Sequence, residues 1–460
     1  GSQLPLSRLL SLRAQRSDAF SLASTVPGTQ DSTPFIGIGI AYNTDTDTDT
    51  DTDTDEKLEE DGGGIITNSA LVAGNMVGAG VLALPRVTEA PGFLLSSAAM
   101  VAVWGYCLSS AIIVAECAGN GRESIQEMAE ASVGRSAGIL MCATFLASNY
   151  LLMVAYISQG ASLLSGLPVP SSDVFGPFLA SCVGDIHQAP LVFTVLVGCT
   201  SLLGPARFAE SANTALVGMI ILSFTGLLAT GIPHIDVTSL GLTPDASSLP
   251  SMLPVAVCAL TFQNVVPAVS KNLDGDPIKI WASLAIGSGI PLITYILWNA
   301  VVLGNIGGID NSSIGSSSAG IASPMDVLGA TSPVLGALIS VFSMSAIVTS
   351  FWGASFSLMI ECTHLLKAVA SRGPTAAMLV LLPPTTVSMA CPDSFVTALE
   401  YVGTYVDPFL YGVAPAFMAY RLRGVGNHKI QFPGGTAALA FVAAITCGYM
   451  LWQTIMMNNI

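Results

Sequence analysis

A series of eleven long apolar segments fills most of this chain from residue 65 onward. An α-helix needs about 20 residues to cross roughly 30 Å of hydrocarbon, and the lengths of these segments are close to that number. The segments, numbered 1 to 11 in chain order, run over approximately 65–85, 93–115, 138–165, 189–204, 211–231, 250–270, 279–303, 334–360, 375–391, 396–419 and 436–457. Only 10% of the 460 residues are charged, against about 25% in soluble domains. The sequence therefore predicts an all-α polytopic membrane protein with about 11 transmembrane helices, embedded in a lipid bilayer.

Basic residues are concentrated in the loops on one side of these segments. The loops after segments 1, 3, 5, 7 and 9 hold only Arg86. The loops after segments 2, 4, 6, 8 and 10, with their flanks, hold Arg122, Arg135, Arg207, Lys271, Lys279, Lys367, Arg372, Arg421, Arg423 and Lys429. Because cytoplasmic loops carry the excess of Lys and Arg, we expect the N-terminus on the cytoplasmic or equivalent side and the C-terminus opposite. No basic stripe that is typical of a nucleic-acid surface occurs, so nucleic acid is not an expected partner.

Residues 1–61 are predicted to be an acidic, disordered tail outside the transmembrane domain, which spans 62–460. The stretch Leu4–Thr25 combines Ser, Leu and Arg, as an organelle-targeting leader or an ordinary disordered tail would. Thr44–Asp55 alternates Thr with Asp, and its carboxylates repel one another, so we expect a linker. A plastid or mitochondrial envelope fits the first stretch, and a plasma or vacuolar membrane fits the rest of the chain.

Two of the apolar segments are interrupted near their middles. Segment 1 contains Gly74-Asn75-Met76-Val77-Gly78-Ala79-Gly80, and segment 6 contains Thr261-Phe262-Gln263-Asn264-Val265-Val266-Pro267. A helix in lipid must satisfy its own backbone groups, so such breaks are tolerated only where they line a cavity. Breaks in corresponding places of two halves indicate a transporter site at the bilayer midplane. We therefore predict a five-plus-five inverted repeat with discontinuous helices 1 and 6, its halves covering about 65–231 and 250–419, and an extra helix at about 436–457.

The residues around these breaks resemble a known family. Leu71–Pro85, Leu260–Pro267, Gly287–Leu292, Thr349–Gly353 and Leu381–Pro384 are similar to motifs of the aromatic amino acid permeases, the tyrosine- and tryptophan-specific proton symporters of the amino acid–polyamine–organocation superfamily. The similarity covers about 65–457. It implies secondary active transport of L-tyrosine or L-tryptophan by alternating access, with H⁺ as the coupling ion and no bound cofactor. The chain departs from the family's usual Phe, Gly and His at the segment 6 break, where it has Phe262, Gln263 and Asn264.

An amino acid zwitterion needs donors for its carboxylate, acceptors for its ammonium group and a pocket for its side chain. In segment 1, the half-helix that starts near Val77–Gly80 presents N–H groups to a carboxylate, and carbonyls around Gly74–Met76 can accept from an ammonium group. The candidate substrate-binding residues are Gly74, Asn75, Met76, Val77, Gly78, Ala79 and Gly80, with Asn149, Tyr150 and Tyr156 of segment 3 and Phe262, Gln263 and Asn264 of segment 6. Helix packing is the alternative role for Gly78, Gly80 and the two tyrosines.

Ionisable residues at membrane depth are costly and are therefore candidates for gating or coupling. Asp407 lies within segment 10, Glu400 lies nearer its outer end, and Arg86 directly follows segment 1. In this superfamily the outer ends of helices 1 and 10 line the external vestibule, so Arg86 with Glu400 or Asp407 is a candidate gate. Asp407 is also a candidate proton carrier, and its alternative role is to cap a kink before Pro408.

The sequence also bears on functions other than proton-coupled aromatic transport. Thr349 and Ser350 of segment 8 can hold sodium with carbonyls of segment 1, or can bond back to their own helix. The nearest alternative is therefore a sodium- or proton-coupled transporter of neutral aliphatic amino acids. The nine cysteines show no CxxC spacing, so no metal site is expected. No HExxH, GxSxG or Walker motif occurs, so an enzyme is not expected, and a channel would need a continuous polar pore face.

Overall fold

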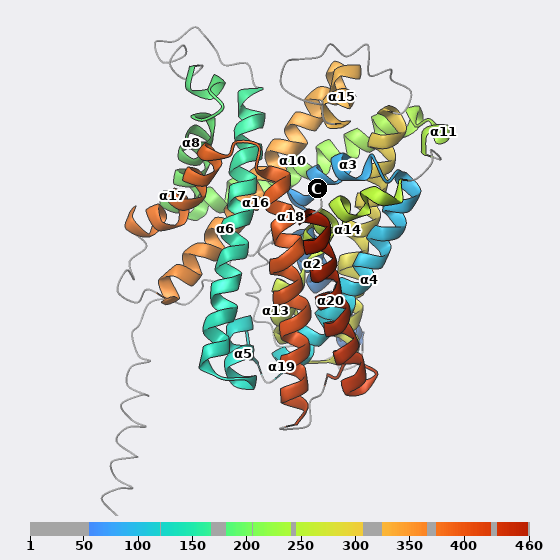
Figure 1. Ribbon diagram of the computed structural model, residues 1–460, viewed down its shortest axis with the longest axis vertical. Helices are drawn as coiled ribbons and strands as arrows, with labels where there is room; N and C mark the ends of the chain where they lie inside the picture. The colour runs from blue at the N-terminus through green and yellow to red at the C-terminus, as the bar shows by residue number, and fades with distance from the viewer. Residues whose placement is uncertain are drawn as a thin grey trace, which may run out of the picture. The chain divides into compact units, whose positions relative to one another are not determined.

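The computed structural model describes residues 55–119, 121–166, 181–204, 206–240, 245–306, 324–365, 374–424 and 430–458. All of them belong to one structural unit, Ile36–Ile460. Every regular element in these ranges is helical, as Figure 1 shows. The predicted all-α membrane fold is confirmed. The predicted leader and most of the Thr-Asp linker lie outside the described residues.

Segments 1 to 5 each contain helix. Segment 1 forms α2 (Asp55–Met76) and α3 (Gly80–Thr88), and segment 2 forms α4 (Phe93–Ala118). The loop that follows carries the short helix α5 (Ile125–Ser132). The remaining elements of this half are α6 (Arg135–Ser165) for segment 3, α8 (Ala189–Phe193), η2 (Thr194–Gly198) and α9 (Cys199–Leu203) for segment 4, and α10 (Ala206–Gly231) for segment 5.

Segments 6 to 11 follow in the same manner. Segment 6 forms α12 (Leu249–Leu260), η5 (Gln263–Val265) and α13 (Val266–Asn272). Segments 7 to 9 form α14 (Pro277–Ile306), α16 (Pro333–Leu365) and α17 (Pro374–Ala390), with α15 (Pro324–Thr331) preceding α16. Segment 10 forms α18 (Phe395–Tyr401), η6 (Val402–Val406), η7 (Phe409–Val413) and α19 (Ala414–Arg423), and segment 11 forms α20 (Gly435–Asn458).

The first membrane helix begins earlier than its apolar segment. Helix α2 starts at Asp55, so residue 61, the predicted end of the tail, lies inside the helix. Glu56, Glu59 and Glu60 fall in its first turns, where acidic residues complement the positive end of the helix dipole. Helix therefore continues through residue 61, and the division into a tail and a transporter domain stays a prediction.

Seven described helices are individually long and apolar enough to cross a membrane, or up to nine spans result if each bent pair is one span. The bent pairs are α2 with α3, at 58°, and α17 with the segment 10 helix, at 118°. Segment 4 contains a shorter apolar helix, Ala189–Leu202. The number of eleven crossings and the bounds of the two repeats therefore stay predictions.

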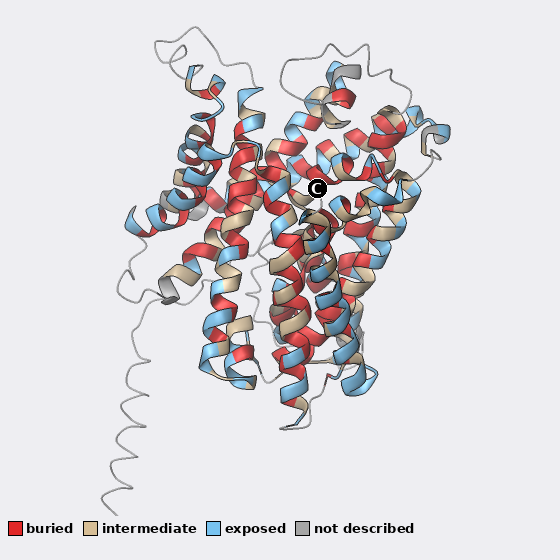
Figure 2. Cartoon of the chain, in the orientation of Figure 1, coloured by how far each residue is buried: buried red, intermediate tan, exposed pale blue. Residues whose placement is uncertain are grey.

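Burial separates a central helix from a peripheral one. In the segment 6 span, 72% of an apolar stretch of 18 residues is buried inside the protein, whereas 17% of such a stretch is buried in α20. Figure 2 shows α20 exposing much of its length. Large apolar side chains such as Leu222, Ile278 and Leu451 are exposed, as expected of residues that face lipid. Segment 6 therefore lies in the core of the molecule, and segment 11 lies at its edge.

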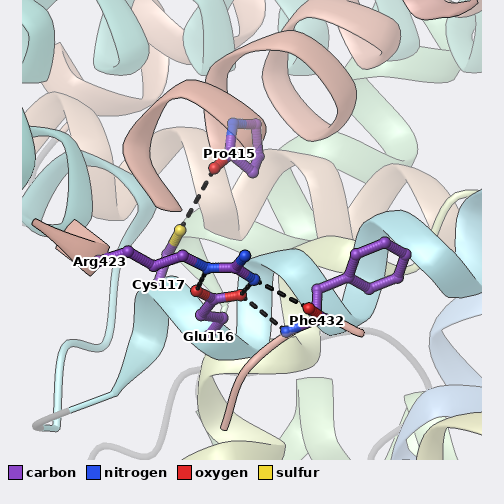
Figure 3. Close-up of polar contacts among 5 residues, drawn as sticks. All are labelled: Glu116, Cys117, Pro415, Arg423 and Phe432. Carbon is purple, nitrogen blue, oxygen red and sulfur yellow. Dashed lines mark hydrogen bonds and ion pairs between the residues drawn. The ribbon is translucent and has the colours of Figure 1, made fainter. Parts of the chain in front are cut away.

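A buried ion pair ties three chain segments together at the predicted cytoplasmic end (Figure 3). Glu116, near the end of α4, accepts hydrogen bonds from Arg423 at the end of α19, Oε1 from Nε at 2.5 Å and Oε2 from Nη2 at 2.6 Å. The Phe432 N–H donates to Glu116 Oε2 at 2.8 Å, and the Phe432 carbonyl accepts from Arg423 Nη2 at 3.0 Å. The pair thus joins segments 2 and 10 to the loop that precedes segment 11.

Candidate functional site

The break in segment 1 lies where the glycine run predicts it. Helix α2 ends at Met76, Val77–Ala79 are not helical, and α3 begins at Gly80. A Cβ atom on Gly78 would lie 2.6 Å from Ser350 Oγ, and one on Gly80 would lie 3.0 Å from both Cα and Cβ of Ala259. Both glycines therefore mark the break and also permit close approach to α16 and α12, so the packing role is real.

Segment 6 is interrupted by extended backbone rather than by a sharp bend. Helix α12 ends at Leu260, Thr261 has φ −76° and ψ 127°, and Phe262 has φ −140° and ψ 6°. Asn264 is exposed, although Gln263 and Val265 on either side of it are buried. The break therefore opens to solvent-accessible space on its Asn264 side.

The two breaks face one another through a pair of side-chain amides. Asn75 Nδ2 donates to Asn264 Oδ1 at 2.9 Å, and Asn264 Nδ2 donates to Asn75 Oδ1 at 3.1 Å. These residues are 189 positions apart in the chain, one in each interrupted segment. The discontinuous helices 1 and 6 are thus confirmed as neighbours, and this reciprocal pair lies between them.

Phe262 and Gln263 do not share the open side with Asn264. Phe262 is fully buried, and Gln263 is 1% exposed. Gln263 Oε1 accepts from the Phe262 N–H at 2.9 Å, and its Nε2 donates to the Cys107 carbonyl of α4 at 3.2 Å. The Gln263 carboxamide is therefore engaged with backbone behind the break, and we expect it to hold segment 6 against segment 2.

Of the three candidate residues in segment 3, one lies beside the segment 6 break and the other two bond to carbonyls elsewhere. Tyr156 interacts electrostatically with Cys258, Asp407 and Tyr295, so it lies beside the segment 6 break. Tyr150 instead donates from its hydroxyl to the Leu379 carbonyl of α17 at 2.9 Å. Asn149, which is buried, donates to the Phe145 carbonyl of its own helix at 2.9 Å.

The two segment 8 candidates contact different partners. Ser350 Oγ accepts a 2.9 Å hydrogen bond from the Ala79 N–H in the segment 1 break. Thr349 Oγ1 donates back to the carbonyls of Ser345, at 3.0 Å, and Ala346, at 3.1 Å, within α16. Ser350 therefore belongs to the break, whereas Thr349 makes the alternative helix-bonded arrangement.

Asp407 lies at the junction of segments 3, 6 and 10. Its carboxyl is buried, Ser148 Oγ of α6 donates to Oδ1 at 3.4 Å, and the Thr261 hydroxyl at the segment 6 break is a second side-chain partner. The π-helical turns η6 and η7 lie directly before and after Asp407-Pro408. Such turns are frequent at functional sites, because they displace side chains from α-helical register.

The groups that face Asp407 are weak acids rather than cations. The titratable side chains that interact with it electrostatically are Tyr106 and Cys107 of α4, Tyr156 of α6, Cys258 of α12, Tyr411 of η7 and Tyr449 of α20. Among the described residues, none of these partners is basic. The Asp407 carboxyl therefore has hydroxyl groups, and no cation, among these neighbours.

Arg86 faces Glu400 and not Asp407. Arg86 is exposed at the end of α3, and it interacts electrostatically with the half-buried Glu400. Both residues are described, and no ion pair joins them in this conformation. Of the two predicted gating partners, Glu400 is the one placed opposite Arg86.

Tyr295 and Thr261 contact the breaks but were not among the predicted site residues. Tyr295 of α14 donates to the Met76 carbonyl at 2.5 Å and lies 3.4 Å from the Ala259 carbonyl. Thr261 is the first residue of the segment 6 motif given above, so its position in the sequence could have identified it as a site residue. A single uncharged tyrosine in an apolar helix carries no comparable signal.

Within the described part of the chain, no group of three or more His, Cys, Asp or Glu residues is placed to hold a metal ion.

Known transport proteins are similar to this chain in sequence. The chain is similar over 389 residues to the tyrosine-specific transport system 1 of Haemophilus influenzae, with 28% identity, 83% of this chain and 94% of that protein covered. It is also 28% identical over 396 residues to a tryptophan-specific transport protein of Pseudomonas aeruginosa, covering 82% of this chain and 91% of the relative.

A solved structure has the same fold. The crystal structure of MhsT in complex with L-phenylalanine matches with a TM-score of 0.52 at 15% sequence identity, covering 85% of this chain and 98% of MhsT. The model of the tryptophan/tyrosine permease family matches residues 62–453, nearly the whole region predicted to be the transporter domain. The chain is a multi-pass membrane protein that belongs to the tryptophan/tyrosine permease family.

Proposed function

We propose that this protein is a proton-coupled symporter of L-tyrosine, L-tryptophan or both, working by alternating access around the facing breaks of segments 1 and 6. The observation that carries the proposal is the reciprocal Asn75–Asn264 amide pair, which lies between the two interrupted helices. The relatives named above transport tyrosine and tryptophan, which supports the same substrate class here.

The substrate's zwitterionic part is expected to bind at the segment 1 break. The start of α3 directs a positive dipole end toward the carboxylate, and carbonyls at the end of α2 accept from the ammonium group. The aromatic ring is expected to pack beside the break. Removing 150–250 Å² of ring surface from water is worth about 4–6 kcal/mol before binding costs, so micromolar affinity, which needs about 8 kcal/mol, also requires the polar contacts of the zwitterion.

Asp407 is the proposed proton carrier. It is a buried carboxyl whose partner Thr261 caps α12 at the segment 6 break, so a change in its charge acts directly on one wall of the site. Thr261 Oγ1 donates its one hydrogen to the Val257 carbonyl at 2.8 Å, so a protonated Asp407 can donate to this oxygen, whereas a charged Asp407 can accept from it only if the hydroxyl turns away from Val257. Sodium coupling is the second candidate, because Ser350 Oγ accepts one hydrogen bond from the Ala79 N–H and Thr349 Oγ1 donates to its own helix, so that each oxygen keeps a lone pair for a cation.

Uptake into proteoliposomes tests coupling. Purified protein should accumulate radiolabelled tyrosine when an inward proton gradient is imposed and not when a sodium gradient is imposed alone. Asp407→Asn should abolish this accumulation while preserving exchange of external for internal substrate, because the amide is neutral like the protonated acid. Asp393→Asn is the matched control, since it makes the same change at an exposed carboxyl that directly precedes the same segment. An Asp407→Asn protein that still accumulates substrate would exclude the proposed carrier.

Competition tests the substrate class. Unlabelled tyrosine and tryptophan should inhibit uptake at similar low concentrations, while alanine, lysine and glutamate should not. If leucine or alanine competes as well as tyrosine, the protein is a general transporter of neutral amino acids. Glutamine belongs in the same series, since an amide-lined break offers it hydrogen-bond partners.

A further inference from the structure

Tyr295 contacts both interrupted helices at once. It lies on α14, four residues after Pro291, and its side chain is fully buried. Its hydroxyl reaches the carbonyl of Met76, the last residue of α2, at 2.5 Å and the carbonyl of Ala259, near the end of α12, at 3.4 Å. Carbonyls in the last turn of a helix lack intrahelical partners. Tyr295 therefore serves the carboxyl-terminal ends of two half-helices.

These two carbonyls lie near a close approach of the two broken helices. Gly80, the first residue of α3, comes so near Ala259 that a Cβ atom on it would be 3.0 Å from the Ala259 backbone. Met76 and Gly80 flank the non-helical residues Val77–Ala79. Any ligand held by the segment 1 break therefore lies beside the Met76 carbonyl.

A phenol hydroxyl has one hydrogen to donate, and here it has two acceptors within reach. At 2.5 Å the Met76 carbonyl receives it, and at 3.4 Å the Ala259 carbonyl receives little. A primary ammonium group brings three further donors to the same place. When such a group binds the Met76 carbonyl, the Tyr295 hydroxyl can turn to Ala259 without leaving either acceptor unpaired.

We propose that Tyr295 is a positioning residue that holds the Met76 and Ala259 carbonyls for the substrate's α-ammonium group and so sets the requirement for that group. The proposal rests on the proposed function, because it assumes that an amino acid binds at the segment 1 break. It assigns the ammonium end of the substrate to carbonyls ordered by a segment that is itself unbroken.

The test compares two ligands that differ only in the ammonium group. Tyrosine and 3-(4-hydroxyphenyl)propionate are measured as competitors of labelled tyrosine in proteoliposomes, on the wild type and on Tyr295→Phe. Charge-assisted hydrogen bonds of this kind correspond to a preference of about tenfold to 100-fold for tyrosine in the wild type. In Tyr295→Phe we expect the apparent affinity for tyrosine to fall by about tenfold while that for the propionate stays unchanged, so that the ratio collapses.

The ratio separates positioning from a structural role. It does not depend on the amount of active transporter, so a variant with reduced abundance still gives it. Tyr295→Met, which fills the volume without a hydroxyl, should give the same loss, and Thr294→Val, which removes a hydroxyl bonded to the Ile290 carbonyl of the same helix, should leave the ratio unchanged. Equal weakening of both ligands, or an unchanged ratio in Tyr295→Phe, overturns the proposal. A wild type that binds neither ligand instead overturns the proposed function.

Discussion

Replacement of Glu116 should destabilise the protein more than any other single loss of charge at its cytoplasmic end. The Glu116 side chain is fully buried and the Arg423 side chain is 11% exposed. Three donors converge on the carboxylate, namely Arg423 Nε, Arg423 Nη2 and the Phe432 N–H. Glu116→Gln keeps the shape but removes the charge and turns an NH₂ group toward donors.

The expected loss of unfolding free energy comes from the partner charge that stays buried after the substitution. Removing one partner of a buried ion pair costs about 3–5 kcal/mol, because the other charge stays buried without compensation. Replacing both partners with apolar side chains is often neutral, so Glu116→Leu combined with Arg423→Met should recover most of the loss. The Lys271–Glu123 pair is the matched control, since its side chains are 60% and 61% exposed and it is worth only about 0.2–1 kcal/mol.

The measurement is the free energy of unfolding in mixed detergent micelles, taken for the wild type, Glu116→Gln, and a cycle made of Glu116→Leu, Arg423→Met and their double variant. Glu116→Gln and Arg423→Met should each fall well below Lys271→Gln in stability. The coupling energy of the cycle should reach about 3 kcal/mol. Strictly additive losses, or a Glu116→Gln protein as stable as Lys271→Gln, would show that the pair does not anchor segments 2 and 10.

Three further outcomes test the geometry of the breaks. Gly80→Val should abolish tyrosine uptake, because its Cβ would lie 3.0 Å from the Ala259 backbone, which cannot move aside as a side chain can. The control Gly105→Ala, whose Cβ would have no atom within 4 Å, should transport normally. A functional Gly80→Val protein would refute the close approach. Ser350→Ala leaves the Ala79 N–H without its partner and should raise the KM for tyrosine by about tenfold, corresponding to about 1–3 kcal/mol; unchanged kinetics would exclude Ser350 from the site. Trp104→Phe removes the 2.9 Å bond from Nε1 to Ser288 Oγ and should lower unfolding stability by about 0.5–1.5 kcal/mol without altering substrate competition; altered competition would place Trp104 in the site.

The sequence predicted the breaks because glycines and an asparagine inside an apolar helix have a direct backbone consequence. Gly78 and Gly80 fall at the interruption, and Asn75 and Asn264 meet across it. The membrane fold followed from the lengths of the apolar segments. These features depend on composition and spacing within a single segment, so they need no knowledge of how segments pack.

The directions of individual side chains could not be predicted in the same way. Gln263 and Asn264 are adjacent, yet one bonds to Cys107 behind the break and the other is exposed, because periodicity fails where a helix is interrupted. Tyr150 and Tyr156 differ similarly, since the first bonds to the α17 carbonyl of Leu379. The contact of Tyr295 with Met76 joins two residues that are 219 positions apart in the chain, so it depends on tertiary packing alone.

The π-helical turns η6 and η7 also bear on how segment 10 is related to its counterparts in other proteins. A π turn arises when one extra residue is accommodated within a helix that continues on both sides. Two such turns, one on each side of Asp407-Pro408, mean that residues beyond them are offset from the faces that an uninterrupted α-helix would assign. A gap-free superposition of this helix on an α-helical counterpart therefore matches Asp407 with a residue on a different face. Correspondences along segment 10 must be drawn separately for α18, for Asp407-Pro408 and for α19.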